Sequence, residues 1–430
     1  MEQKAWIIDV NMGYGHRRTS FPLRGIAIEG QTISANNYPG MPWLDRAIWE
    51  GSRKFYEFIS NFKKIPIIGS AMFGLFNEFQ KIHPLYPKQD MSRVNIFFSG
   101  THWLIKMGWG RHLIEKCKNE PSAPFVTTFF IPAFMAENFN YPGEIYCIIC
   151  DTDIARPWAT LHPQKSRIKY FAPTLRVVDR LLTYGVPRAN IYFTGYPLPL
   201  NNVGIGNNEI LKEDLRHRLV NLDPQKTYFN KYKFLISGML GELPGKPNHP
   251  LTMLCSIGGA GAQKEETTTI IKKMKPELES KEMKIILSAG SKEHVKNYFF
   301  SEIRKMKMGH LIGTSIEILY EKEVFLYFEK FNEALRKTDI LLTKPSELSF
   351  YAGLAIPILM LPTIGYQEDF NRDWLLKNGL GIEPENIMYI DQWLPDYLKA
   401  GYFADIAMQG FIECEQMGAF KIRDIIFNNH

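Results

Sequence analysis

Cysteine is scarce in this sequence, and its distribution excludes a disulfide framework. The 430 residues hold five cysteines, an odd number spread widely along the chain, whereas disulfide-stabilised domains are small and dense in cysteine. One pair, Cys147 and Cys150, has the spacing of a zinc-ligand pair. It lies inside an apolar run, and no second such pair or close histidine pair completes a set of ligands. We therefore interpret both as buried strand cysteines and predict no metal site.

The sequence also lacks an apolar run of about 18 or more residues, the length that would mark a candidate transmembrane helix. Residues 1–4 have no features of a secretory signal peptide. The net charge of +6 is modest for this length, so it favours an anionic ligand or a membrane surface over nucleic acid. We expect a cytoplasmic location, with peripheral contact to the inner face of the membrane as a hypothesis.

What the sequence does contain is a repeated alternation of short β-rich segments with helical segments. This alternation is typical of parallel sheets covered by helices on both faces. A stretch rich in Pro, Gly and Asn, 197–208, divides it into two halves. We predict an α/β protein of two Rossmann-like domains facing across a cleft. The N-terminal domain spans 1–203, the C-terminal domain spans 204–405, and a helical segment, 406–430, packs back on the first domain.

Some local assignments are less regular than this plan. Residues 95–98 and 324–327 are mostly apolar and predict strands, and helices are expected near 103–118 and over 329–337. The region 223–250 is rich in Pro, Gly, Lys and Tyr and gives no assignment.

A glycine turn follows the first predicted strand, where Gly13 and Gly15 precede His16 and Arg17. Glycine lets the backbone approach a ligand closely. A histidine at the carboxyl end of a strand, beside a cleft, is suited to acid–base chemistry. The alternatives are a turn chosen only for tightness and a histidine that caps the helix.

A second glycine turn, "IGGAGAQ", opens the second half and precedes a helix. Backbone N–H groups at a helix start attract phosphate, so the sequence predicts a phosphate site here. The segment does not match the P-loop, and its glycines depart from the GxGxxG spacing of nicotinamide sites. The residues predicted to bind are Gly258, Gly259, Gly261 and Gln263.

Polar side chains follow two further strands at the same predicted sheet edges. Asp151 and Asp153 end a very apolar strand, and either could act as a base or orient His16; the alternative is an N-cap of the next helix. A later segment, 341–371, carries polar groups after two successive strands. Those expected to contact a ligand are Lys344, Ser346, Glu347, Gln367 and Glu368.

Taken in order, "MGYGHRRTSFPL", "GGAGAQ" and "TKPSELSFYAGLAIPILMLP…GYQEDFN" resemble the two-domain (GT-B) glycosyltransferases. The similarity is greatest to the monogalactosyl- and glucosyl-diacylglycerol synthases and to the N-acetylglucosaminyltransferase that makes lipid II. The segment "APTLRVVDRLLTYGVPRANIYFTGYPL", 172–198, also looks like the end of that family's acceptor domain. The resemblance covers most of the chain apart from about 37–90 and 220–250.

The resemblance implies an inverting sugar transfer from a nucleotide sugar, usually linked to UDP, to a lipid-borne or other hydroxyl, without a cofactor. His16 with Asp151 or Asp153 would then be base candidates, Gly258–Gly261 the diphosphate site, and Gln367 and Glu368 the contacts to sugar hydroxyls. Two departures stand out. Tyr14 replaces a family glycine, and Phe350 occupies the position of the ribose-binding glutamate, for which Glu347 is the candidate substitute. An epimerase or hydrolase on the same fold, and a non-catalytic nucleotide-sugar-binding protein, are the alternatives.

The segment 42–88 interrupts this pattern and predicts an amphipathic helix. Apolar residues trace one helical face, with basic residues beside it, which is typical of a helix lying at a membrane surface. The alternative is a helix packed on the N-terminal domain. The apolar face comprises Leu44, Ala47, Ile48, Phe55, Phe58, Ile59 and Phe62.

Overall fold

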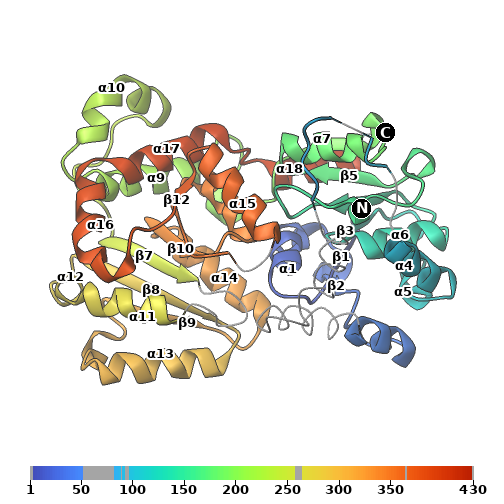
Figure 1. Cartoon of the computed structure of the whole chain (residues 1–430), viewed down its shortest axis with the longest axis horizontal. Helices are drawn as coiled ribbons and strands as arrows, with labels where there is room; N and C mark the ends of the chain where they lie inside the picture. The colour runs from blue at the N-terminus through green and yellow to red at the C-terminus, as the bar shows by residue number, and fades with distance from the viewer. Residues whose placement is uncertain are drawn as a thin grey trace. The chain divides into compact units, whose positions relative to one another are not determined.

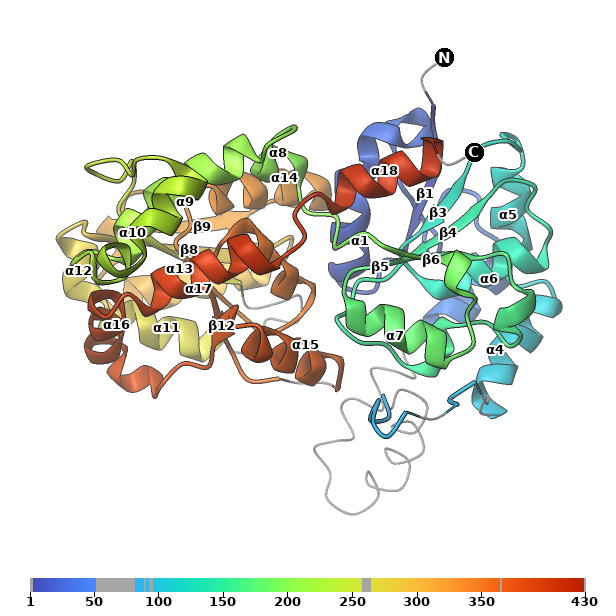
Figure 2. The same cartoon turned by 90° about the horizontal axis from the view of Figure 1, so that it is seen from above.

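The computed structural model describes residues 3–51, 82–88, 90–92, 96–256, 264–363 and 366–428. The chain divides into two compact units. The first unit is Met1–Pro197 with Met417–His430, and the second unit is Leu198–Gln416. Figures 1 and 2 show that each unit is a sheet covered by helices.

The first unit contains a parallel sheet of six strands in the order β2-β1-β3-β4-β5-β6. Its central strands are buried on both faces, which explains why they read as apolar runs without alternation. The strands are β1 (Trp6–Asp9), β2 (Ile33–Ser34), β3 (Phe125–Thr127), β4 (Ile145–Ile148), β5 (Lys169–Ala172) and β6 (Ile191–Phe193).

The second unit contains another parallel sheet of six strands, in the order β12-β11-β10-β7-β8-β9. Because crossovers between parallel strands are right-handed, α11 and α13 cover one face, and α14, η7 and α15 cover the other. The strands are β7 (Leu251–Ser256), β8 (Met283–Gly290), β9 (Ile316–Tyr320), β10 (Ile340–Thr343), β11 (Ile358–Met360) and β12 (Gly381–Ile382). The predicted fold class, two α/β parts with parallel sheets, is confirmed.

Helices connect these strands in both units. In the first unit they are α1 (Gly15–Ser20), η1 (Phe21–Ile26), η2 (Ile28–Gly30), a helix over 43–51, α4 (Ile96–Lys106), α5 (Arg111–Cys117), α6 (Phe130–Asn138), η3 (Arg156–Trp158), η4 (Pro163–Lys165), α7 (Leu175–Thr183), η5 (Arg188–Asn190) and α18 (Gly418–Asn428). In the second unit they are α8 (Leu200–Val203), α9 (Glu209–Leu222), α10 (Thr227–Leu240), α11 (Lys264–Lys273), α12 (Lys275–Glu279), α13 (Glu293–Lys305), η6 (Gly309–Leu311), α14 (Val324–Leu335), η7 (Glu347–Leu354), α15 (Tyr366–Lys377), η8 (Ile387–Tyr389), α16 (Ile390–Lys399) and α17 (Tyr402–Glu413).

Two predicted strands are wrong, because both segments are helical. Residues 96–98 open α4, and Val324 begins α14. Glu323 caps the start of α14, because its side chain accepts a hydrogen bond from Leu326 N at 2.7 Å. This cap favours the helix over a strand. The helix predicted near 103–118 is two helices, α4 and α5, and the unassigned region 223–250 contains α10.

The boundaries of the units follow packing. The first unit ends at Pro197 rather than at 203, because α8 already packs on α9 and α14, and Asn202 Nδ2 donates to Asn332 O at 2.8 Å. The second unit reaches Gln416 rather than 405, because α17 packs on α9 and η7.

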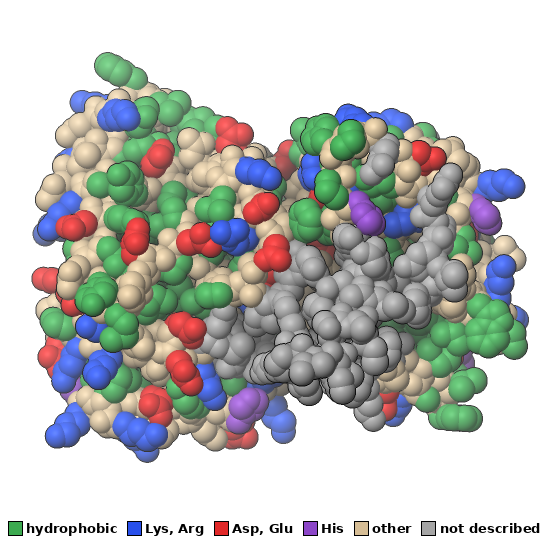
Figure 3. Space-filling model, viewed as in Figure 1, with side chains coloured by type: hydrophobic (Ala, Val, Ile, Leu, Met, Phe, Trp, Pro, Cys, Tyr) green, Lys and Arg blue, Asp and Glu red, His purple; other side chains and the backbone are tan. Residues whose placement is uncertain are grey.

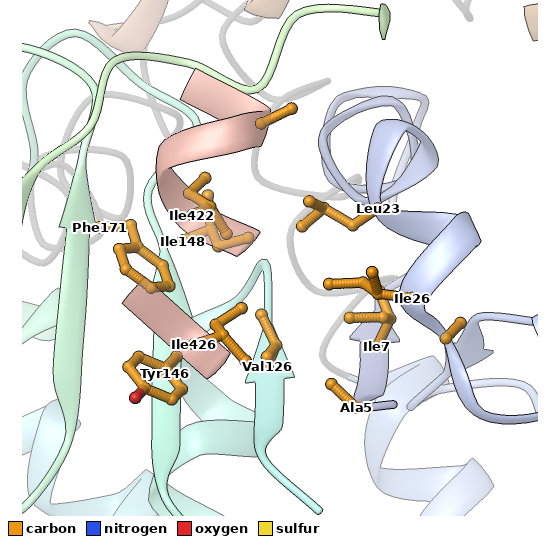
Figure 4. Close-up of a cluster of buried hydrophobic side chains, with 12 residues drawn as sticks. Ala5, Ile7, Leu23, Ile26, Val126, Tyr146, Ile148, Phe171, Ile422 and Ile426 are labelled. Carbon is orange, nitrogen blue, oxygen red and sulfur yellow. The ribbon is translucent and has the colours of Figure 1, made fainter. Parts of the chain in front are cut away.

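The last helix, α18, completes the core of the first unit (Figure 4). It packs beside η1 against one face of the sheet. Its first residue, Gly418, lies so close to the segment that follows β6 that a Cβ there would stand 2.3 Å from Tyr196 O. The buried cluster is Ala5, Ile7, Leu23, Ile26, Ala27, Val126, Tyr146, Ile148, Phe171, Ala419, Ile422 and Ile426.

We expect Ile422→Ala to destabilise the protein by about 2–5 kcal/mol, because Ile422 is fully buried among sheet residues and its loss leaves a cavity. Urea denaturation measures this change. Arg423→Ala, on the exposed side of the same helix, is the matched control and should change the free energy of unfolding by less than about 0.5 kcal/mol. Equal unfolding midpoints for the two variants would contradict this role for α18.

Candidate functional site

The strand order of the first sheet reverses between β1 and β3, which are hydrogen-bonded neighbours. Such a reversal leaves a crevice outside the carboxyl ends of the two strands, where ligands of open α/β sheets bind. The chain leaves β1 through a loop in which Gly13 has a φ of +88°, and α1 then begins at Gly15. The predicted residues Gly13, Gly15, His16 and Arg17 therefore all lie at this point of the first sheet.

The ring of His16 is held in one orientation by the ends of two other strands. Its Nδ1 lies 2.8 Å from the carbonyl oxygen of Thr128, just after β3, and 3.5 Å from Cys150 Sγ, just after β4. The Phe129 ring makes an edge contact at 4.9 Å between centroids. Because a carbonyl oxygen can only accept, Nδ1 carries the hydrogen of the neutral ring, and Nε2 is the nitrogen able to take up a proton.

A buried carboxylate that the sequence analysis did not single out supports the same loop. Asp9 is the last residue of β1 and is fully buried. Its Oδ1 accepts from Ser34 Oγ at 2.5 Å and its Oδ2 from Ser20 Oγ at 3.1 Å. Burial raises the pKa of Asp9, and the charge of Arg17 acts in the opposite direction. Asp9 thus ties α1, which carries His16, to β1 and β2; an aspartate ending an apolar strand is the signal that could have identified it.

The two aspartates after β4 have different surroundings. Asp153 is almost fully buried and accepts hydrogen bonds from Arg176 Nε at 2.9 Å and from Arg180 Nε and Nη2, each at 2.8 Å. A buried carboxylate that is ion-paired with two arginines has a structural role. We therefore do not retain Asp153 as a base candidate. Asp151 is half-buried and follows Cys150, the neighbour of His16.

We expect Asp153→Asn to lower the free energy of unfolding by about 3–5 kcal/mol, because it leaves the buried Arg180 without its counter-charge. Thermal and urea denaturation measure the change. Asp179→Asn, which neighbours Arg180 on α7, is the matched control and should leave stability within about 0.5 kcal/mol of the wild type. A stable Asp153→Asn protein with impaired turnover would restore Asp153 as a base candidate.

In the second sheet the strand order reverses between β7 and β10. After β10, Lys344 Nζ forms an ion pair with Glu368 Oε1 from the first turn of α15. Ser346 is the N-cap residue of η7 and Glu347 lies in its first turn. The structure therefore gathers four predicted residues beside the end of β10, while the neighbouring Gln367 is exposed on α15.

Phe350, on the same helix as Glu347, is a buried core residue. Its side chain is 4% exposed, and its ring packs 5.4 Å from the ring of Trp374 on α15. It occupies the core between η7 and α15, where a carboxylate would be costly to bury.

The second glycine turn lies outside the described residues. The described chain stops at Ser256, which pairs in register with Thr343 at the end of β10, and resumes at Lys264. The predicted residues that lie outside it are Gly258, Gly259, Gly261 and Gln263. Within the described ranges, there is no cluster of three or more His, Cys, Asp or Glu side chains arranged to hold a metal ion.

One protein family, described as "Domain of unknown function (DUF6938)", matches this sequence over residues 245–312. These residues include β7, the second glycine turn and α13, so the match lies within the second unit. No curated protein matches the sequence.

Several solved structures are similar in fold. MnaA of S. aureus, in a structure with UDP, has 13% identity and a TM-score of 0.49, covering 100% of this chain and 97% of that one. MurG of Acinetobacter baumannii has 9% identity and a TM-score of 0.48, covering 99% of each chain. The UDP-GlcNAc 2-epimerase of Neisseria meningitidis, bound to UDP-GlcNAc, has 12% identity and a TM-score of 0.43, covering 79% of this chain and 84% of that one. At these values the similarities carry no argument about the reaction or the ligands of this chain.

Proposed function

We propose that the chain is an inverting glycosyltransferase that moves a sugar from a nucleotide sugar, with UDP as the expected nucleotide, to a hydroxyl acceptor. The observation that carries the proposal is the His16 ring, whose Nδ1 is hydrogen-bonded to Thr128 O at 2.8 Å beside the carboxyl end of β1. The order of the three sequence motifs gives independent support.

In the proposed reaction His16 acts as the general base. Its Nε2 takes the proton of the acceptor hydroxyl, and the acceptor oxygen forms a bond to the anomeric carbon of the sugar. The bond from that carbon to the diphosphate oxygen breaks, and its electron pair leaves with the nucleoside diphosphate. Asp151 is proposed to stabilise the imidazolium that forms. The resemblance assigns stabilisation of the leaving diphosphate to Gly258, Gly259 and Gly261 through backbone N–H groups.

The polar group after β10 is proposed to bind the donor. A carboxylate can accept hydrogen bonds from sugar or ribose hydroxyls, but an isolated one would repel the diphosphate. The Lys344 ammonium offsets the charge of Glu368. The Glu368 carboxylate can therefore accept hydrogen bonds from hydroxyls of the donor without repelling its diphosphate. Glu347 is proposed to bind ribose in place of Phe350, and Gln367 to contact a sugar hydroxyl.

The acceptor is proposed to be lipid-borne, with the segment 42–88 in contact with the membrane. In the helix over 43–51, Asp45 accepts from Gly110 N at 3.3 Å and Trp49 packs edge-on against Trp109 at 4.9 Å. The exposed residues of this helix include Trp43 at 79% and Leu44 at 54%, together with the charged Arg46 and Glu50. Phe55, Phe58, Ile59 and Phe62 lie outside the described residues. Among the helices described, none is long and apolar enough to cross a bilayer.

We expect His16→Ala to lower kcat by about 10²–10⁴-fold, because the general base is lost while the donor contacts on the second unit remain. The KM for the donor should stay nearly unchanged. Steady-state kinetics with a nucleotide-sugar panel and lipid acceptors measures both. His112→Ala, a histidine hydrogen-bonded to Tyr38 in the same unit, is the control, and unchanged turnover in His16→Ala would remove His16 from the base role.

The same assay separates the alternatives. A transferase leaves the donor intact when the acceptor is omitted, apart from slow hydrolysis. An epimerised donor or rapid release of free sugar under that condition would identify the epimerase or hydrolase instead. Donor binding without any turnover would identify a binding protein.

We expect Lys344→Met to weaken donor binding about tenfold, or ~1.4 kcal/mol, because Glu368 is left as an unbalanced negative charge beside the phosphates. Isothermal titration calorimetry with nucleotide sugars measures the Kd. Arg336→Met, which breaks an exposed ion pair with Asp214 in the same unit, is the control and should leave the Kd unchanged.

Two further variants belong in that titration. Glu347→Gln should also weaken binding, whereas Phe350→Leu should not, because Phe350 is buried against Trp374. Wild-type affinity in both Lys344→Met and Glu347→Gln would show that the donor does not bind at the end of β10.

A further inference from the structure

One helix of the second unit exposes large apolar side chains to solvent. On α10, Phe234 is 94% exposed, Leu235 43% and Met239 38%. Leu235 and Met239 are four positions apart and Phe234 adjoins Leu235, so these three side chains form one exposed apolar side of the helix, which we call the α10 ridge. Lys231 lies just before a kink in α10 at Tyr232, where φ is −118° and ψ is 24°. Figure 1 shows α10 at the outer margin of its unit, and Figure 3 shows hydrophobic and basic side chains side by side there.

The other side of α10 fixes the helix firmly in the unit. Tyr228, Ile236 and Leu240 are buried, and the Asp223 carboxylate accepts hydrogen bonds from Tyr228 N at 3.2 Å and Phe229 N at 2.7 Å. Thr227 Oγ1 donates to a carbonyl oxygen at the end of α16 at 2.7 Å. The ridge is therefore presented by an anchored helix rather than by a loose loop.

The charged side chains of α10 itself are all lysines, and the Asp405 carboxylate of α17 lies near Tyr228 and Lys231. From Pro224 to Gly241 the sequence contains three lysines and no acidic residue. Lys231 and Lys233 are exposed on α10, and Lys231 Nζ lies 4.9 Å above the Tyr232 ring. Lysines that flank an outward phenylalanine match a surface that is apolar below and negatively charged at the level of its headgroups.

We propose that the α10 ridge is a membrane-docking site of the second unit, in which Phe234 and Leu235 enter the headgroup boundary of an anionic bilayer and Lys231 and Lys233 bind the lipid phosphates. A second copy of the chain fits less well, since a symmetric contact through this face would set lysines against lysines. This site is separate from the segment 42–88 and does not depend on the reaction that the protein catalyses.

Flotation of the full chain with vesicles tests the proposal. Vesicles of phosphatidylcholine with about 30% phosphatidylglycerol are compared with phosphatidylcholine alone. We expect the pair Phe234→Ser and Leu235→Ser to lower the partition coefficient at least about tenfold on anionic vesicles. The pair Lys231→Gln and Lys233→Gln should remove most of the dependence on phosphatidylglycerol. Ile205→Ser, at a loop residue 78% exposed in the same unit, is the matched control and should bind like the wild type.

Two comparisons show whether a loss of vesicle binding comes from the α10 ridge itself. The serine pair is also made in a Phe55→Ser, Phe58→Ser, Phe62→Ser background, where a further loss of at least about fivefold supports an independent contact by α10. The urea midpoint of the serine pair should equal that of the wild type, because both side chains are solvent-exposed. Wild-type partitioning of the serine pair, or dimers in light scattering that the serine pair dissociates, would overturn the proposal.

Discussion

Parallel pairing of β1 with β3 is the constraint on which the candidate site depends. The ladder pairs Ile8 with Thr127, and Thr128 N donates to Ile8 O at 3.0 Å. This pairing fixes the Thr128 peptide, whose carbonyl oxygen then holds His16 Nδ1. Because the strand order reverses at this pair, the loop that carries His16 emerges beside the end of β3. The orientation of the ring and the identity of its basic nitrogen are therefore consequences of sheet topology.

The burial of the charged side chains distinguishes those that support the fold from those that are candidates for ligand binding. Asp153 and Arg218 are buried and hydrogen-bonded. Asp153 accepts from two guanidinium groups, and Arg218 donates to four backbone carbonyl oxygens, those of Leu335, Thr338, Leu354 and Ala355. Groups that are buried and hydrogen-bonded in this way hold parts of the fold together rather than contact a ligand. Lys344 and Glu368 are paired but remain 24% and 14% exposed. A partly exposed pair at the carboxyl end of β10 can exchange part of its bonding for a ligand at modest cost.

The sequence predicted the features that depend on local residue patterns, but it did not predict those that depend on contacts between residues far apart in the chain. Alternating strands and helices predicted the two parallel sheets, and His16 became a base candidate because it follows a glycine turn after a strand. Asp151 and Asp153 could not be told apart, since the arginines that clamp Asp153 stand more than twenty positions further along the chain. The apolar side chains of residues 324–327 predicted a strand. The segment is helical, and the Glu323 side chain caps the helix by accepting a hydrogen bond from the backbone N–H of Leu326. The short strand β5 was missed because its four residues carry little pattern of their own.

The segment after β10 shows how an unusual sequence can still be compatible with the proposed function. Between Thr343 and Pro357, Glu347 is the only acidic residue. Phe350, where the resemblance places a ribose-binding glutamate, fills a core position against Trp374, so restoring a glutamate there would bury a charge. Glu347 stands at the start of η7, half-buried and beside the N-cap residue Ser346, where a carboxylate is stabilised by the helix terminus. If a carboxylate of this segment binds ribose, the packing of η7 leaves Glu347 as the side chain able to do so.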